Sequence, residues 1–250
     1  MAVAEEVRSQ LFFGQARNVR IWDLLFRFET LSRTFIASDA PTGPAILPLV
    51  PDTFAASSLM KLFEETGAYL RGHFRLTSGL HSPEYLQCAK VLAYPAHAER
   101  LGRDLAQRLA ALIGETKIDL VVAPAMGGLI IGHEVARQFG VPFLFTERDA
   151  ATNEMTLRRG FELHPGQKAV VIEDVITTGG STREVVRLLV DAGATVLAAG
   201  SIIDRSGGKA DVGVPRVSLQ ELNPVTYDPA DCPLCREGVP VVKPGSRRVA

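Results

Sequence analysis

Cysteine, tryptophan and long apolar runs are all scarce in this chain of 250 residues. Its three cysteines cannot build a disulfide framework, so we expect a reducing compartment and a cytoplasmic protein. No apolar run approaches the ~18 residues of a membrane-spanning helix, and the N-terminus lacks the basic-then-apolar layout of a secretory signal. Neither sign of charge is in excess, with 27 basic and 28 acidic residues, which predicts no nucleic-acid footprint and no membrane-surface patch.

The composition of the chain changes at about Met60. Residues 1–59 contain one amphipathic stretch, 18–32, and then a segment with four prolines and one glycine, 37–51, that is typical of a linker. We interpret 1–59 as an N-terminal extension that is either poorly structured or an over-extended reading of the start. The alternative is an additional helix docked on the main domain, which we expect to span 60–250.

Short apolar runs alternate with helical patterns from Met60 onward. The apolar run 118–124 is almost unbroken, as expected for a strand buried on both faces. Further strands are predicted at 141–147, 168–175 and 195–204, and helices at 97–114, 127–140 and 181–193. This alternation predicts an α/β protein with a mostly parallel sheet flanked by helices. We expect residues 72–94 and 212–250 to form a small β-rich hood.

The stretch VVIEDVITTGGSTREVV, residues 170–186, combines an apolar strand, two adjacent acids and a polar loop that contains glycine. Ligands of open α/β sheets bind at the carboxyl ends of the strands, where this loop leads into the next helix. Loop amides, hydroxyl groups and the positive end of that helix favour an anion such as a phosphate monoester. Glu173 and Asp174 suit sugar hydroxyls, which donate hydrogen bonds to carboxylates, and Mg²⁺. A ribose 5-phosphate with free 2- and 3-hydroxyls satisfies both halves of the stretch.

The common nucleotide-binding motifs are absent, because neither G-x-x-x-x-G-K-[ST] nor G-x-G-x-x-G after a strand occurs in the sequence. VVIEDVITTGG instead resembles the phosphoribosyl-diphosphate signature of the type I phosphoribosyltransferases. Three further stretches resemble the orotate phosphoribosyltransferases of that family. They are FRLTSGLHSPEYLQ (74–87), VVAPAMGGLIIGHEVARQFGVP (121–142) and IIDRSGG (202–208). The resemblance covers about residues 60–245.

This resemblance implies the type I phosphoribosyltransferase fold and a glycosyltransferase of the pentosyl class. The implied reaction moves the 5-phosphoribosyl group from phosphoribosyl diphosphate to orotate, giving orotidine 5-phosphate and diphosphate in de novo pyrimidine synthesis. The resemblance also implies a homodimer and Mg²⁺ that is bound mainly through the diphosphate. It assigns no protein side chain as a metal ligand.

The resemblance also implies roles for individual residues. Glu173 and Asp174 would hold the ribose hydroxyls, and Arg205 would receive the orotate carboxylate. From adjacency in the sequence alone, we also expect Asp204 to orient Arg205. Tyr85 stands where the family has aromatic residues that close over the base. The other implied substrate contacts lie in the signature loop and in the diphosphate loop, and they are Val175, Ile176, Thr177, Thr178, Gly179, Gly180, Ser181 and Thr182 with Ala125, Met126 and Gly127.

The family's mobile catalytic loop, rich in Lys and His, corresponds here to residues 146–163, which contain no lysine. We expect Arg148 to keep the family's arginine role and either Arg158 or Arg159 to replace the missing lysine. A buried lysine can donate a proton near neutral pH and an arginine cannot, so this replacement would change how the loop assists catalysis.

Cys232 and Cys235 have the spacing of a zinc knuckle, but a single C-x₂-C is only half of a tetrahedral site. His73, His81 or a partner subunit would have to complete it. A turn or a redox-sensitive thiol pair explains the same spacing. The sequence leaves the choice between these interpretations open.

Two alternatives to an orotate-specific enzyme also stay open. One is a phosphoribosyltransferase for another base, although a site built around Arg205 should reject uracil, which lacks a carboxylate. The other is a non-catalytic regulator that senses phosphoribosyl diphosphate, which the missing lysines suggest. Such regulators tend to carry a DNA-binding helical module, and residues 1–59 show neither a basic face nor a helix-turn-helix pattern.

Overall fold

The computed structural model describes residues 56–76 and 78–244. Most of the predicted extension 1–59 lies outside these described residues, so its interpretation stays a prediction. The first described helix, α3, spans Ala56–Glu65 and therefore begins four residues before the boundary predicted at Met60.

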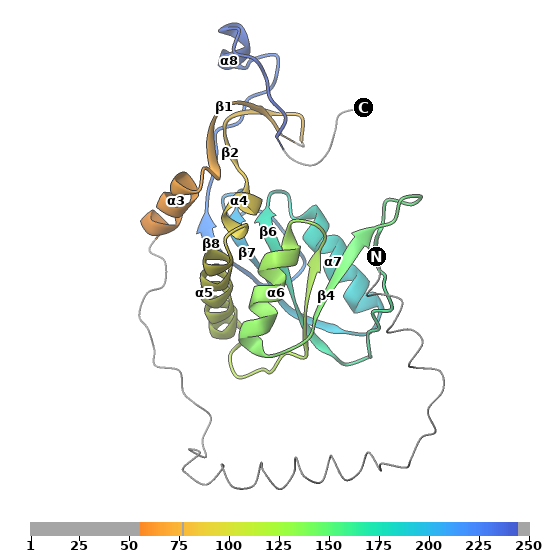
Figure 1. Cartoon of the computed structure of the whole chain (residues 1–250). Helices are drawn as coiled ribbons and strands as arrows, with labels where there is room; N and C mark the ends of the chain where they lie inside the picture. Colours follow the sequence, from red (N-terminus) through yellow and green to blue (C-terminus); the bar gives the residue numbers. More distant parts are fainter. Residues whose placement is uncertain (1–55, 77, 245–250) are drawn as a thin grey trace, which may run out of the picture. The chain divides into compact units, whose positions relative to one another are not determined.

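A six-stranded sheet forms the centre of the described structure (Figure 1). Its strands lie in the order β5–β4–β3–β6–β7–β8, and β5 alone is antiparallel to its neighbour. Their bounds are β3 Leu120–Pro124, β4 Phe143–Arg148, β5 Met155–Leu157, β6 Lys168–Ile176, β7 Thr195–Asp204 and β8 Arg216–Glu221. The predicted mostly parallel sheet is confirmed. The sequence does not predict β5, and it assigns the residues of β8 to the hood, although β8 extends the main sheet instead.

Helices cover both faces of this sheet (Figure 1). α5 (Pro95–Ile113) and α6 (Gly128–Phe139) pack on one face and α7 (Gly180–Asp191) packs on the other. Side chains of a strand alternate between the two faces, so Val121 of β3 joins the core under α5 and α6 while Val122 joins the core under α7. All five residues of β3 are buried, as predicted from its unbroken apolar run.

Glycines end two of these helices. Gly140 follows α6 with a left-handed backbone, φ 67°, which glycine adopts without steric cost. Gly114 follows α5 with φ 64°. Among the described residues, none of the helices combines the length and apolar character needed to cross a membrane.

A small hood stands over the carboxyl ends of the sheet strands (Figure 1). It contains the antiparallel pair β1 (Tyr69–Arg75) and β2 (His81–Leu86) and the short helix α8 (Pro233–Arg236). The C-terminal segment is joined to this pair at two points, where Val242 bridges to Phe74 of β1 and Tyr227 bridges to His81 of β2. After β2 the chain enters α4 (Cys88–Leu92), whose buried residues belong to the main core. Residues of α4 and β8 are therefore not part of the hood, although the predicted ranges 72–94 and 212–250 include them.

Candidate active site

Glu173 and Asp174 lie at the carboxyl end of β6, which sits between β3 and β7 in the sheet. Burial raises the pKa of Glu173 well above its ordinary value, and the neighbouring Asp174 carboxyl raises it further through charge repulsion and a hydrogen bond. Burial also raises the pKa of Asp174, although the Val175 N–H donates to Asp174 Oδ1 at 2.8 Å. The pair therefore holds a proton more tightly than free carboxyls do, and it needs donors or a cation to become fully ionised.

The loop between β3 and α6 lies directly against this acid pair. A Cβ atom added to Gly127 would lie 2.7 Å from Asp174 Cγ and 2.9 Å from Asp174 Oδ2, closer than real Cβ contacts. The next residue, Gly128, is as confined, because a Cβ there would lie 2.9 Å from the Ile172 carbonyl oxygen. The Ala125–Met126 peptide bond in this loop is cis, and the Met126 side chain is 76% exposed. The structure thus brings the loop after β3 against the acid pair at the carboxyl end of β6.

The loop after β6 leads into the first turn of α7. Gly179 has φ 77°, and a Cβ there would lie 2.9 Å from Val212 Cγ1, so glycine is required both by conformation and by space. Thr177 and Thr178 are exposed, Ser181 is half-buried and Thr182 is buried. With the amides at the start of α7, these hydroxyls form a group of donors facing the carboxyl end of the sheet.

Val175 and Ile176, which are also predicted substrate contacts, have different surroundings from the rest of this stretch. Ile176 is buried in the core under α7, so only its backbone is available to a ligand, and its carbonyl accepts the Arg205 N–H at 2.8 Å. Val175 is half-buried on the opposite face. The alternation of side chains along β6 explains why neighbouring residues of one motif reach such different surroundings.

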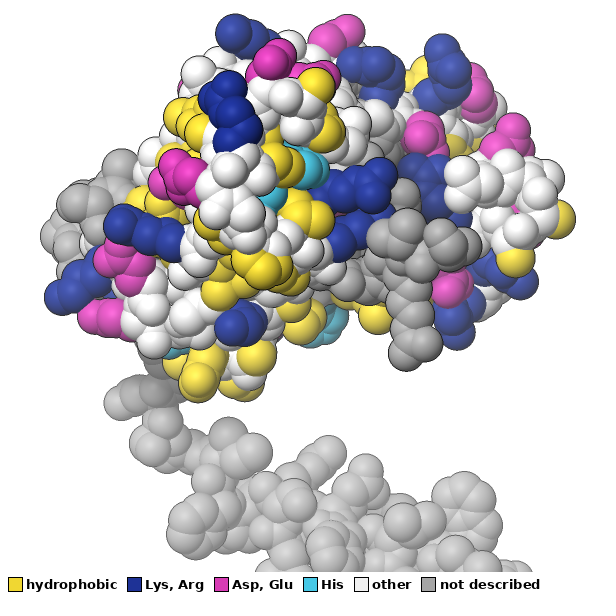
Figure 2. All heavy atoms as spheres, turned by 90° about the horizontal axis from the view of Figure 1, so that it is seen from above, with side chains coloured by type: hydrophobic (Ala, Val, Ile, Leu, Met, Phe, Trp, Pro, Cys, Tyr) yellow, Lys and Arg dark blue, Asp and Glu magenta, His cyan; other side chains and the backbone are white. Residues whose placement is uncertain are grey.

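Tyr85 of β2 and Arg205, which follows β7, line one pocket beneath the hood. Its empty volume is about 420 Å³, part of it open to solvent, and Tyr69, Glu84 and Asn223 are among its other lining residues. Burial lowers the pKa of Arg205, and Tyr85 opposes this shift. Burial also raises the pKa of Tyr85, and among the smaller influences Asp174 raises it. The pocket therefore adjoins the acid pair. Seen from above, basic side chains lie beside a hollow at this end of the molecule (Figure 2).

The prediction that Asp204 orients Arg205 is wrong. Asp204 is fully buried, and its Oδ1 accepts hydrogen bonds from the Ser206 N–H at 2.7 Å and the Ser206 hydroxyl at 2.6 Å. Its other oxygen pairs with Arg216 of β8. Asp204 thus fixes the turn that follows β7, and adjacency in the sequence does not make it a partner of Arg205.

Arg148 forms an ion pair with a residue of α7. It lies at the end of β4, but its guanidinium pairs with Glu184 of α7, with Nη1 2.7 Å from Oε2 and Nη2 3.2 Å from Oε1. Nη2 also lies 3.5 Å from the Ser181 hydroxyl oxygen. The charge of Arg148 is therefore beside the loop 177–182.

The two arginines of the predicted catalytic loop are not equivalent. In this segment β4 and β5 pair as an antiparallel hairpin (Figure 1). Arg159 folds back onto it, with Nε 2.8 Å and Nη2 2.9 Å from the two carboxylate oxygens of Glu147, and its guanidinium lies over the Phe145 ring. Arg158 is exposed and contributes to lowering the pKa of Glu147 and of Asp149 at longer range.

Sequence reasoning does not identify Tyr69 and Glu84 as pocket residues. The Tyr69 hydroxyl donates to Glu84 Oε1 at 2.5 Å, across the β1–β2 pair. Cys88 is also missed; it is buried beside the backbone of Asp174, with Sγ 3.9 Å from the carbonyl oxygen. No local motif marks these residues. The pairing of the two hood strands brings Tyr69 to Glu84, and the packing of α4 brings Cys88 to β6.

Comparison with known proteins places this arrangement in a family. The chain matches the phosphoribosyl transferase domain family over residues 91–234, a range that contains the acid pair, both loops and Arg205. It is 51% identical over 191 residues to the orotate phosphoribosyltransferase of Pelotomaculum thermopropionicum and 53% identical over 190 residues to that of Carboxydothermus hydrogenoformans. Each match covers 76% of this chain and 97% of the relative.

Solved structures show the same relationship. The orotate phosphoribosyltransferase from Aeropyrum pernix superposes with a TM-score of 0.55 at 28% identity, over 66% of this chain and 93% of that one. An adenine phosphoribosyltransferase superposes with a TM-score of 0.52 at 18% identity, over 64% of this chain and 99% of that one, which is a likeness of fold alone. The chain belongs to the orotate phosphoribosyltransferases, within the phosphoribosyltransferase family.

Proposed function

We propose that this chain transfers the 5-phosphoribosyl group from phosphoribosyl diphosphate to orotate, which yields orotidine 5-phosphate and diphosphate. The observation that carries the proposal is the close approach of Gly127 to Asp174, which brings the acid pair of β6 and the loop after β3 to one point. Membership of the family supports the reaction, and the pocket lined by Tyr85 and Arg205 supports the choice of base.

In this proposal the sugar binds through Glu173 and Asp174. Its 2- and 3-hydroxyls donate hydrogen bonds to the two carboxyls, which supplies the donors that the buried pair lacks. Breaking the C1–O bond builds positive charge on the ribose ring, and ionised carboxylates held beneath the ring stabilise that charge. The catalytic contribution of the pair is therefore largest when both groups are ionised.

The 5-phosphate binds to the loop 177–182 and the start of α7. Backbone amides of the loop, the threonine and serine hydroxyls and the helix N-terminus all present positive dipoles to the phosphate. Arg148 adds a full charge, since it lies against the Ser181 hydroxyl. Its ion pair with Glu184 holds the guanidinium in place before the substrate arrives.

The diphosphate binds at the loop of Ala125, Met126 and Gly127. A bound Mg²⁺ would neutralise the diphosphate oxygens, and the carboxylate oxygens of Glu173 and Asp174 are ligands of the type that Mg²⁺ prefers. The loop amides and the start of α6 hold the leaving group in line with the ribose. Met126 is exposed but uncharged, so this loop supplies no side-chain charge of its own.

Orotate binds in the pocket of about 420 Å³ beneath the hood. Arg205 receives its carboxylate, because a guanidinium pairs with a planar carboxylate through two parallel hydrogen bonds. Tyr85 packs on the ring, and Thr177 at the edge of the phosphate loop holds the base next to the ribose. The negative charge of Glu84 is partly masked by the Tyr69 hydroxyl, which donates to it.

We also propose that the chain acts as a homodimer in which Arg158 reaches the active site of the partner subunit. Arg158 is exposed on the β4–β5 hairpin, whereas Arg159 is bound to Glu147 of its own chain. Mixing two inactive variants tests this: Arg158→Ala and Asp174→Asn subunits would form heterodimers with one intact site. Recovery of activity to about a quarter of the wild-type value is expected, and no recovery despite subunit exchange contradicts the proposal.

The reaction itself is tested by mixing the chain with orotate, phosphoribosyl diphosphate and Mg²⁺ and following the loss of orotate absorbance. Uracil is the matched control, because it has the same ring without the carboxylate. Rapid loss of orotate with little turnover of uracil is expected. Equal rates with both bases would remove the assignment of the base, and no turnover of either would remove the reaction.

A further inference from the structure

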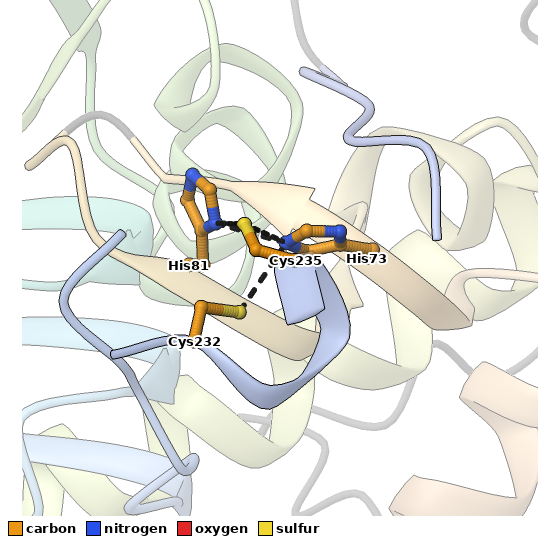
Figure 3. A group of neighbouring side chains, drawn as sticks. All are labelled: His73, His81, Cys232 and Cys235. Atoms are coloured by element: carbon orange, nitrogen blue, oxygen red, sulfur yellow. Dashed lines mark hydrogen bonds between the residues drawn. The ribbon is translucent and has the colours of Figure 1, made fainter. Parts of the chain in front are cut away.

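Four potential metal ligands converge in the hood, away from the acid pair. They are His73 of β1, His81 of β2, Cys232 at the start of α8 and Cys235 within α8 (Figure 3). One donor atom from each residue lies within 4.8 Å of all the others, and this is a group of Cys₂His₂ composition. His73, His81 and Cys232 are buried, while Cys235 is exposed. Three separate segments of the chain thus supply one compact set of nitrogen and sulfur donors.

A hydrogen bond from the His73 ring to the backbone fixes which of its two nitrogens can bind a metal. His73 Nδ1 lies 2.7 Å from the carbonyl oxygen of Val239, so Nδ1 carries the proton and donates it there. The lone pair of the ring is therefore on Nε2, which points into the cluster. Metal-binding histidines are usually oriented in this way, by a carbonyl or carboxylate that receives the other ring N–H.

The spacing of the donors fits a tetrahedral ion. Zinc bonds of ~2.3 Å to sulfur and ~2.0–2.1 Å to nitrogen place ligands about 3.3 Å apart for two nitrogens and about 3.6 Å apart for nitrogen and sulfur. His73 Nε2 lies 2.8 Å from His81 Nδ1, 3.4 Å from Cys232 Sγ and 3.7 Å from Cys235 Sγ. Cys235 Sγ lies 3.3 Å from His81 Nδ1. Adjustments of up to about 0.5 Å would bring these four distances to those expected around zinc.

Hydrogen bonding alone accounts poorly for the same cluster. The single lone pair of His73 Nε2 faces one ring nitrogen and two thiols at once, and it accepts only one strong hydrogen bond. Thiols are weak donors, so the buried Cys232 gains little from a hydrogen bond in return for its burial. A cation in the middle would satisfy all four donor atoms together.

We propose that His73, His81, Cys232 and Cys235 bind one structural Zn²⁺ ion that fastens the C-terminal segment to the β1–β2 pair. Two thiolates and two imidazoles are the ligand set of closed tetrahedral zinc sites, which leave no position for water or substrate. Among the backbone bonds that join these segments are those from Val242 to His73 and between His81 and Tyr227. The metal links the same segments through side chains, and a hood with so small a core gains stability from such a link.

The metal content of the full-length chain gives the first test. Chain purified under reducing conditions, exposed to Zn²⁺ and then desalted should contain about one zinc per chain by mass spectrometry of the metal. Cys235→Ser and His73→Ala should each reduce this to less than about a fifth. Two matched controls should keep the full content: Cys88→Ser, a thiol outside the cluster, and His133→Ala, an exposed histidine on α6.

Cobalt binding to the wild-type chain provides a second test, which does not depend on whether any variant folds. Co²⁺ added to the metal-free wild-type chain should give the intense visible bands of tetrahedral coordination together with thiolate charge-transfer absorption, and Zn²⁺ should abolish both. Hydrogen exchange should then be faster in residues 69–75 and 225–242 after chelation, with β6 unchanged. A folded, reduced wild-type chain that retains no zinc, a Cys235→Ser variant that retains it, or an octahedral cobalt spectrum would each overturn the proposal.

Discussion

Replacing Gly127 by alanine perturbs the acid pair from the neighbouring loop without altering either carboxylate. The new Cβ would lie 2.7 Å from Asp174 Cγ, so the carboxyl group must move by at least about 0.7 Å to reach ordinary contact. Asp174 is not free to move, because its Oδ1 accepts the Val175 N–H at 2.8 Å and its own backbone N–H lies 3.3 Å from Glu173 Oε1. The displacement therefore falls on the two groups that we propose to hold the ribose.

The size of the effect follows from the cost of overpacking, which is about 1–3 kcal/mol for an added methyl group in a filled space. If this cost is borne mainly when the sugar binds, the affinity for phosphoribosyl diphosphate falls by about 5–150-fold. Titration calorimetry of the variant with phosphoribosyl diphosphate at a fixed Mg²⁺ concentration measures this directly. Thermal unfolding of the same samples shows how much of the cost appears as lost stability instead.

Gly132→Ala is the matched control, because it lies on α6, five residues further along the chain. Its Cβ would lie 2.5 Å from the Phe143 ring and 3.0 Å from Ala123 Cβ, both in the core. This variant should lower the melting temperature while leaving the affinity for phosphoribosyl diphosphate within about twofold. Wild-type affinity in Gly127→Ala, or equal losses of affinity in both variants, would refute the reasoning.

Three further predictions concern single side chains. Glu173→Gln should stabilise the ligand-free protein by about 1–3 kcal/mol at neutral pH, because it removes a buried carboxyl whose ionised form is favoured in the unfolded chain and disfavoured in the fold. Its raised pKa means that wild-type stability falls as the pH rises from the ordinary value of 4.5 towards the folded value. Melting curves should show the variant's advantage growing over that range and absent below it. Arg158→Ala should lower kcat by about 10²-fold in steady-state assays. Arg159→Ala removes only an exposed ion pair with Glu147 and should leave kcat nearly unchanged. A large loss in Arg159→Ala with little change in Arg158→Ala would contradict the choice of Arg158. Arg205→Ala should raise the KM for orotate by about 10–150-fold with little change in the KM for phosphoribosyl diphosphate. Arg205→Lys should lose less than Arg205→Ala but should not reach the wild-type KM for orotate, since lysine lacks the paired donors. Equal changes in both KM values would count against a contact with orotate.

The fold was largely predictable from local pattern. β3 and β6 have nearly continuous apolar sequences because helices cover both of their faces, and this pattern identifies them as buried strands. Their regular alternation with α5, α6 and α7 then leaves few possible topologies for a parallel sheet. β5 was missed because three residues carry no periodicity. β8 was assigned to the hood because its place beside β7 depends on pairing that no local signal records.

The site was predictable to the extent that its residues share one motif. Glu173, Asp174 and the loop that follows them are contiguous, so their place at a strand end fixes their common location. Partners that meet only through the tertiary fold were not predictable: Arg148 contacts α7 from β4, and Asp204 turns away from Arg205. The difference between Arg158 and Arg159 depends likewise on how the hairpin turns.

The central claim is that two neighbouring carboxyls at the end of β6 bind the ribose of phosphoribosyl diphosphate. The most direct measurement is the affinity of the double variant Glu173→Gln, Asp174→Asn for phosphoribosyl diphosphate by titration calorimetry, with folding verified by circular dichroism. Our account predicts a loss of at least about 100-fold, because both hydroxyl contacts lose their charged acceptor. Affinity equal to that of the wild-type chain, in a folded variant, would contradict it.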